Sequence, residues 1–184
     1  MSYLKSLPAN AGLTPIFQAF PKFAQPLIGY IEVVMRGESP FSPAERELIA
    51  AYVSGLNDCS YCRDVHSQIA VALGIDESAT THLFSGSAFQ QVDQKMRPVL
   101  AFARKLTLSP GKMTAADANE VFAAGWNDRA LYGVASVCGL FNHVNRLVNG
   151  LGIDASEADK TAEAQRLAAG GYAAQLTQML APPA

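Results

Sequence analysis

Residues 42–66 decide the fold; they read SPAERELIAAYVSGLNDCSYCRDVH. Ser42 followed by Pro43 and Glu45 is the start signal of a helix, because serine caps the helix, proline suits the first turn and the glutamate completes a capping box. Apolar residues then recur at helical spacing: Leu48, Ile49, Tyr52, Val53 and Leu56. This pattern predicts a helix that begins after Ser42 and ends near 55–57.

A second helix is predicted directly after the first. Asp58 has a side chain typical of an N-cap residue, which would place Cys59 in the first helical turn. Gly74 is a natural residue just past the end of this helix. Because only the short turn at Asn57-Asp58 joins the two helices, we expect them to run antiparallel.

The rest of the chain also shows helical rather than alternating patterns, which predicts an all-α bundle in a single domain, 1–184. Its core would span about 15–150 and its C-terminal helix about 155–180, weakened at Gly170-Gly171. The most apolar segment, about 129–149, is expected to be the central and most buried helix. Further helices are predicted over about 24–36, 76–84, 91–107 with a bend or break at Pro98, and after Thr114 with Asp117 in its first turn.

A faint internal repeat links two of these regions. The capping pattern at Ser42 leads to Gly55-Leu56-Asn57-Asp58, and the pattern at Thr114 leads to Gly125-Trp126-Asn127-Asp128. A duplicated helix pair would explain the echo. Shared capping chemistry alone would also produce it.

Composition and charge narrow the functional classes. Of 184 residues, 49% are hydrophobic and only 16% are charged, which favours a surface partly covered by a partner subunit. A net charge of −2 disfavours nucleic-acid binding. We find no leader or membrane-spanning pattern. The three cysteines do not suggest a secreted disulfide scaffold, so a cytoplasmic location is expected, where a Cys-x-x-Cys pair points to redox or metal chemistry.

The candidate chemistry lies in Cys59, Cys62 and His66. A helix N-terminus favours a thiolate, and His66 lies four residues after Cys62, on the same helical face. A second cysteine three residues away can close a disulfide once the first is oxidised. Glu47, on the preceding helix, could orient and support the imidazole if the two faces match. These are the requirements of a peroxide-reducing thiol site.

The pattern Glu47-x11-Cys59-x-x-Cys62-x3-His66 resembles the AhpD-like alkylhydroperoxidases of the carboxymuconolactone decarboxylase superfamily, and most closely their uncharacterized peroxidase-related branch. The likeness extends over about 15–150, through helix order and the segment Asn142-x-x-Asn145-Arg146. It implies an all-α fold, a homo-oligomer (trimer or hexamer), a hydroperoxide substrate and a dithiol or lipoylated-protein reductant, with no cofactor and no metal.

By position, the resemblance makes Cys62 the peroxidatic cysteine, Cys59 the resolving one, and His66 with Glu47 a proton relay. Helix-terminus reasoning alone instead favours Cys59 as the more acidic thiol. We side with Cys62 because the histidine spacing is the more specific feature. The chain departs from the family at Tyr61, where AhpD has a histidine, so part of the relay is missing or replaced by a phenol.

Other readings of the same residues remain. Zinc would need a fourth ligand such as His82, His143 or Cys138, and c-type haem is excluded because Arg63 follows the second cysteine. Cys138, within an apolar segment, is interpreted as a core residue. The rival functions are a protein disulfide oxidoreductase that uses the same pair and a non-enzymatic, redox-sensing helical oligomer.

Overall fold

The protein is described by a computed structural model that covers residues 2–8, 10–84 and 89–174. Within these ranges the fold is all-helical, as predicted, with nine α-helices, two short 3₁₀ turns and no strand. None of the described helices is long and apolar enough to cross a membrane. In chain order the elements are α1 Leu13–Ala19, α2 Pro21–Arg36, α3 Pro43–Leu56, α4 Ser60–Ala72, α5 Glu77–Thr81, η1 Gln94–Met96, α6 Arg97–Leu108, η2 Pro110–Lys112, α7 Ala115–Ala123, α8 Asp128–Gly150 and α9 Glu157–Gly170.

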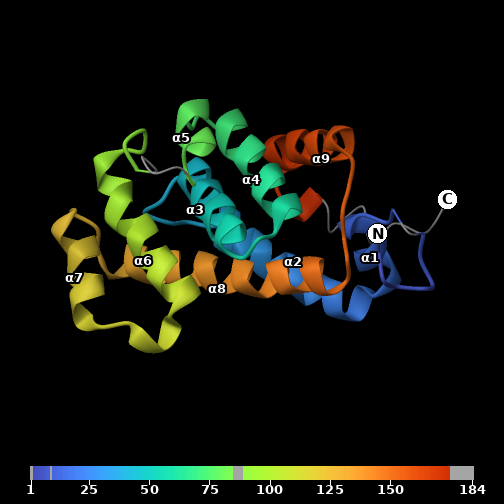
Figure 1. Cartoon of the computed structure of the whole chain (residues 1–184), viewed down its shortest axis with the longest axis horizontal. Coiled ribbons are helices and arrows are strands. Elements are labelled where there is room, and N and C mark those ends of the chain that lie inside the picture. Colours follow the sequence, from blue (N-terminus) through green and yellow to red (C-terminus); the bar gives the residue numbers. More distant parts are fainter. Residues whose placement is uncertain (1, 9, 85–88, 175–184) are drawn as a thin grey trace.

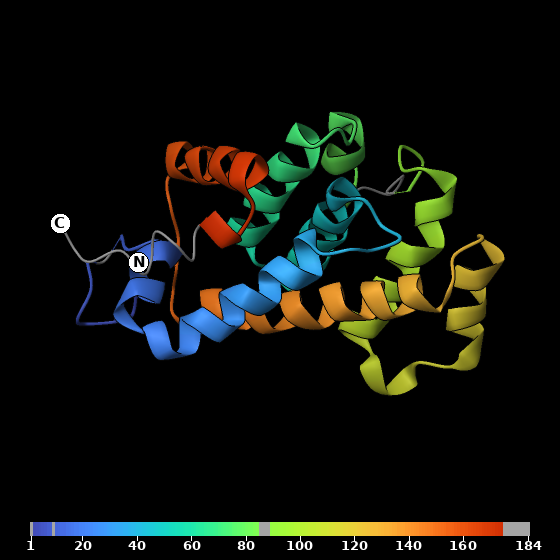
Figure 2. The same cartoon turned by 180° about the vertical axis from the view of Figure 1, so that it is seen from behind.

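The long helix α8 forms one edge of the bundle, and the α3–α4 hairpin packs beside it (Figure 1). Helices α6 and α7 lie at one end of α8, while α2 crosses the other end, as the view from behind shows (Figure 2). Helix α9 returns to pack along α4. The α3–α4 hairpin is therefore covered by helices from both halves of the chain.

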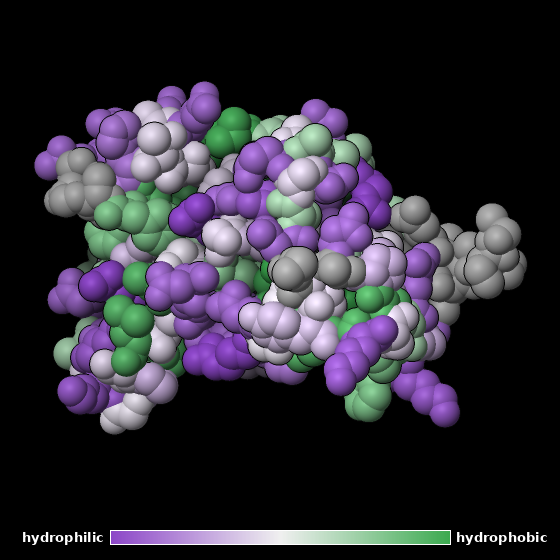
Figure 3. All heavy atoms as spheres, turned by 45° about the vertical axis from the view of Figure 1, so that its right-hand side comes forward, coloured by the Kyte–Doolittle hydropathy of each residue, from purple (hydrophilic) through white to green (hydrophobic). Residues whose placement is uncertain are grey.

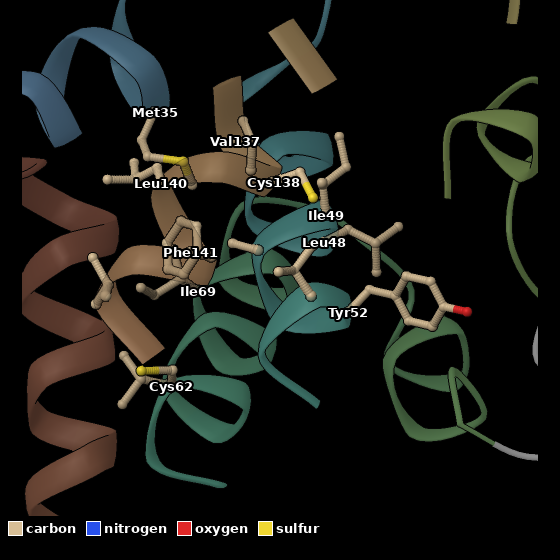
Figure 4. Close-up of a cluster of buried hydrophobic side chains, with 14 of the residues drawn as sticks. Met35, Leu48, Ile49, Tyr52, Cys62, Ile69, Val137, Cys138, Leu140 and Phe141 are labelled. Atoms are coloured by element: carbon tan, nitrogen blue, oxygen red, sulfur yellow. The ribbon is translucent and has the colours of Figure 1, made fainter. Parts of the chain in front are cut away.

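The most completely buried helix is α3 rather than α8. Every residue of α3 from Arg46 to Ser54 is buried, whereas α8 buries one face and leaves the other in solvent. The expectation for 129–149 was therefore wrong, because polar residues punctuate that segment. The hydrophobic cluster in Figure 4 joins the two helices, and Cys138 lies inside it as a core residue, as predicted.

The hairpin turn differs from the prediction by one residue. The Ser42–Glu45 capping box is confirmed, with both reciprocal hydrogen bonds formed. However, Cys59 is the N-cap of α4, and Asp58 adopts a left-handed conformation with φ +53°. The Cys59 amide donates to the Ser54 carbonyl across 2.9 Å, which turns the chain so sharply that the helix begins one residue later.

Three other parts of the structure also differ from the prediction or extend it. Helix α1 was not predicted, because its seven residues are too few for a clear period. The segment 91–107 is broken, with Pro98 in the first turn of α6, where proline's missing amide hydrogen has no helical partner to lose. Helix α9 ends at Gly170 and the chain turns at Gly171 (φ +66°). The predicted helical stretch from 175 onward lies outside the described residues.

The surface combines hydrophilic side chains with scattered apolar ones. Figure 3 shows hydrophobic patches interrupted by hydrophilic residues on one face of the molecule. The large hydrophobic side chains exposed in the described ranges include several on α2 and one on α8: Tyr3, Phe20, Phe23, Tyr30, Val33, Phe84, Leu108 and Tyr132. These exposed apolar side chains are consistent with the high hydrophobic fraction of the sequence, 49%.

The left-handed turn residue gives a prediction on stability. Asp58 is exposed, so a substitution there changes the backbone more than the packing. Asp58→Val should lower the free energy of unfolding by about 1–2 kcal/mol, because a β-branched residue is strained at positive φ. Asp58→Gly should stay within about 1 kcal/mol of the wild type. Urea denaturation measures both; equal losses for the two variants would contradict the strain argument.

Candidate active site

The centre of the candidate site is the carboxylate of Glu47, which is 0% exposed in the middle of α3. Arg36 of α2 forms an ion pair with Oε1 at 2.7 Å, and Nδ1 of His66 from α4 lies 2.5 Å from Oε2. The hydroxyl of Tyr172, which follows α9, donates to Oε1 across 3.0 Å. Four segments of the chain, namely α2, α3, α4 and the turn after α9, thus meet at one buried charge.

These partners keep Glu47 ionised. Burial alone would raise its pKa, but the charge and hydrogen bond of His66, followed by those of Arg36, outweigh burial and lower the pKa below its ordinary value. An ionised carboxylate only accepts hydrogen bonds, so the facing Nδ1 of His66 carries the hydrogen. Nε2 is then the ring nitrogen left for a ligand. The imidazole is held edge-on against Phe141, with ring centroids 4.5 Å apart.

His66 and Cys62 line the same small cavity, of about 30 Å³. Its other polar walls are Tyr61, Glu163 and Tyr172, and the remaining walls are aliphatic and aromatic. Among the contacts of the described residues, no hydrogen bond joins the imidazole directly to the Cys62 sulfur. The two groups therefore face a shared space that is large enough for a very small polar molecule.

The two thiols are reduced and almost fully buried, with Cys59 0% and Cys62 2% exposed. Their side chains share a hydrogen bond, which lowers the pKa of Cys59 and raises that of Cys62. Burial raises the pKa of both thiols. The backbone amide of Cys62 lowers the pKa of Cys59. Cys59 is the N-cap residue of α4, but its side chain forms no capping hydrogen bond. The first ionisation of the pair, at Cys59, is therefore easier than the second, at Cys62.

Asn145 supports both sulfurs from α8. It is 0% exposed, and its amide lowers the pKa of Cys59 and of Cys62 through hydrogen bonding. Its position is fixed by a donated hydrogen bond to Ser54 at 3.0 Å and by one accepted from Asn57, also at 3.0 Å. Of the Asn142-x-x-Asn145-Arg146 segment, Asn145 therefore reaches the thiol pair.

Tyr61, where the sequence departs from the family, is bound to α9. It is 4% exposed, and its hydroxyl donates to Glu163 across 2.8 Å. Burial, followed by the charge of Glu163, raises the Tyr61 pKa far above its ordinary value, so the phenol stays protonated. Beside it, Lys160 bridges to Asp64 at 2.9 Å. Both contacts fasten α9 over the helix that carries the cysteines.

The structure brings all four predicted site residues into one region. Glu47 contacts His66, His66 shares a cavity with Cys62, and Cys62 contacts Cys59. Across residues 2–8, 10–84 and 89–174, no three His, Cys, Asp or Glu side chains are placed to hold a metal ion. Sequence reasoning gave no site role to several residues that contact this group: Arg36, Glu163 and Tyr172.

Those residues carried different signals. Arg36 is four residues after Glu32 on one face of α2, a spacing shared by many surface pairs. Glu163 and Tyr172 lie in an Ala-rich segment, and no sequence spacing relates them to the pattern Glu47-x11-Cys59-x-x-Cys62-x3-His66. Their participation depends on how α9 folds back.

Comparison with known proteins shows which family and which solved structures the chain resembles. Residues 21–105 match the Carboxymuconolactone decarboxylase family. The structure is similar to an uncharacterized peroxidase-related protein from Silicibacter sp. TM1040, with 29% identity and a TM-score of 0.70 over 75% of this chain and 72% of that one. No curated protein matches the chain.

Two further solved structures share the fold at lower identity. One is an uncharacterized peroxidase-related protein from Ralstonia eutropha JMP134 with an alkylhydroperoxidase AhpD core (19% identity, TM-score 0.74, 82% of this chain and 78% of that one). The other is the debrominase Bmp8 in complex with 2,3,4-tribromopyrrole (16% identity, TM-score 0.68, 90% and 81%). The bundle is thus an AhpD-like helical fold. The chain is thus similar to the Carboxymuconolactone decarboxylase family over residues 21–105 and to the folds of these solved proteins over most of its length.

The lowered pKa of Glu47 makes a prediction about acid stability. A carboxyl whose folded pKa lies below its unfolded value of about 4.3 stabilises the fold above that pH, and this contribution is lost as the pH falls through the folded pKa. The stability advantage of the wild type over Glu47→Gln should therefore be full at neutral pH and shrink below about pH 4.

Urea denaturation between pH 3 and 7 measures this difference. Glu120→Gln, at an exposed position on α7, controls for the change in net charge. A wild-type advantage that stays constant down to pH 3 would show that the Glu47 carboxylate is not held by its partners.

Proposed function

We propose that the protein is a thiol-dependent peroxidase that reduces hydroperoxides through a reversible Cys59–Cys62 disulfide. The observation that carries this proposal is the cavity of about 30 Å³ where Cys62 faces His66, with the second thiol hydrogen-bonded behind the first. A hydroperoxide group is small enough to approach such a space. The AhpD-like fold and the peroxidase-related neighbour support the same activity class.

The proposed cycle balances atoms and electrons. The Cys62 thiolate attacks one peroxide oxygen, the O–O bond breaks, and the products are a Cys62 sulfenic acid and an alkoxide that takes a proton to become an alcohol. Cys59 then attacks the sulfenic sulfur and releases water, which leaves the disulfide. An external dithiol, such as a lipoylated protein, restores both thiols and is itself oxidised.

The proposed residue roles follow from position. Cys62, rather than Cys59, lines the cavity, and this supports Cys62 as the attacking residue. The pKa directions place the first thiolate on Cys59, so a proton shift along the shared hydrogen bond is needed before Cys62 can attack. His66, held by Glu47, presents its other ring nitrogen and can move the proton required by the leaving oxygen.

One observation favours the first rival, a protein disulfide oxidoreductase. Cys59 stands at the start of a helix with a lowered pKa, as an attacking thiol of that class requires. Its side chain is, however, 0% exposed, and a protein substrate would have to reach the sulfur. Burial therefore favours a small oxidant over a protein disulfide. A redox-sensing, non-enzymatic oligomer is the reading left if neither substrate reacts.

The proposal extends to cellular context. A thiol pair that an external dithiol must restore after each cycle fits a cytoplasmic location. The exposed apolar side chains of α2 and α8 fit a homo-oligomer, for which the family resemblance suggests a trimer or hexamer.

Thiol counting tests the cycle. Reduced protein mixed with limiting hydroperoxide should lose two thiols for each hydroperoxide consumed, with Cys138 retained. Cys62→Ser should stop peroxide consumption, and Cys59→Ser should accumulate a sulfenic acid that a dimedone-type reagent traps. Cys138→Ser is the matched control and should react like the wild type. If peroxide reacts no faster than with free cysteine while a protein disulfide is reduced quickly, the oxidoreductase reading replaces this one.

The role of His66 has its own test. His66→Ala should lower kcat/KM for hydroperoxide by about 10²–10⁴-fold, the range typical of a lost general acid–base group. His82→Ala is the control, because His82 is an exposed histidine. A stopped-flow pH series compares the two variants. A His66→Ala pH profile that coincides with that of the wild type would remove His66 from the mechanism.

A further inference from the structure

The chain returns to the site after α9, beyond the part that matches the family. Gly171 turns the backbone at φ +66°, and a Cβ built there would lie only 3.3 Å from Glu32 Oε2. The amides of Tyr172 and Ala173 both donate to that same oxygen, across 2.7 and 2.8 Å. Glu32 of α2 thus clips the turn 171–173 in place.

The clip delivers one side chain to the buried carboxylate. Tyr172 is 4% exposed, and its hydroxyl lies 3.0 Å from Glu47 Oε1 and 3.5 Å from His66 Nδ1. Burial, followed by the charge of Glu47, raises the Tyr172 pKa well above its ordinary value. The hydroxyl therefore stays protonated and donates a hydrogen bond to Glu47.

The two carboxylate oxygens have separate partners. Oε1 receives Arg36 and Tyr172, and Oε2 faces His66. The Arg36 guanidinium also lies over the Tyr172 ring, 5.0 Å from its centroid. Because both donors hold Oε1, the carboxylate cannot turn without breaking two contacts, and Oε2 stays directed at the imidazole.

We propose that Tyr172 is a positioning residue for the Glu47–His66 pair, and that the Glu32 clip holds it there. Its expected effect on catalysis rests on the proposed peroxidase function. Its expected effect on the imidazole does not. The tyrosine side chain also forms part of the cavity wall, so the C-terminal turn completes the site that the motif begins.

Nuclear magnetic resonance of histidine-labelled protein tests the positioning directly. Only three histidines are present, and His66→Ala assigns the resonance of interest. In Tyr172→Phe, the Glu47 carboxylate loses one of the two contacts that hold Oε1, so its bond to the His66 Nδ1 hydrogen should weaken and that proton should move upfield. Tyr52→Phe, another buried tyrosine on α3, is the matched control and should leave it in place. An unchanged or downfield proton in Tyr172→Phe overturns the proposal.

Kinetics with a double-mutant cycle test the clip. Tyr172→Phe should lower kcat/KM for hydroperoxide by about 10-fold, the lower end of the effect expected for the loss of one hydrogen bond to a charge. Glu32→Ala should cause a smaller loss in the same direction, and the double variant should be no worse than Tyr172→Phe alone, because both changes remove one contact. Fully additive losses would contradict the clip.

The two measurements separate the two hypotheses. If the wild type reduces no hydroperoxide but the Nδ1 proton moves as expected, the peroxidase proposal fails and the positioning role stands. If the wild type is active and Tyr172→Phe changes neither the resonance nor kcat/KM, Tyr172 has no positioning role.

Discussion

The structure depends on keeping one charge ionised inside the bundle. Moving a carboxylate from water into a protein interior costs several kcal/mol unless opposite charge and hydrogen bonds compensate. Glu47 meets this condition with Arg36, His66 and Tyr172, which come from α2, α4 and the turn after α9. These three segments must be in place together, so the buried charge links α2 and the turn after α9 to the α3–α4 hairpin.

The same constraint explains the unusual burial of α3. This helix carries two adjacent charged residues, Arg46 and Glu47, at 3% and 0% exposure. Arg46 donates to the carbonyls of Val34 and Gly37 at the end of α2, in place of a carboxylate partner. The C-terminal end of α2 is thus tied to α3 twice, by Arg46 of α3 and by Arg36, the last residue of α2. This double attachment fixes the Arg36 guanidinium beside Glu47, where it can lower the carboxyl pKa.

The sequence predicted what local rules determine. The capping box at Ser42, the hairpin and the spacing of Cys62 and His66 follow from neighbours along the chain, and the structure places them accordingly. Asp58 was misassigned as a cap because its side chain also suits the left-handed conformation that it adopts. Tyr172 could not be assigned, since no sequence spacing relates it to Glu47 and only the return of α9 brings them together.

Burial also sets two requirements of the proposed chemistry against each other. An enclosed, mostly apolar cavity strengthens the hold of Glu47 on His66, because fewer water molecules compete for the charge. The same enclosure raises the pKa of Cys62, which a peroxide-reducing thiol needs ionised. The neighbouring Cys59 is the largest cause of the raised Cys62 pKa, ahead of burial, and the Asn145 amide offsets part of the rise. Cys59 therefore makes the attack by Cys62 harder and contributes to the proposed cycle afterwards, when it closes the disulfide.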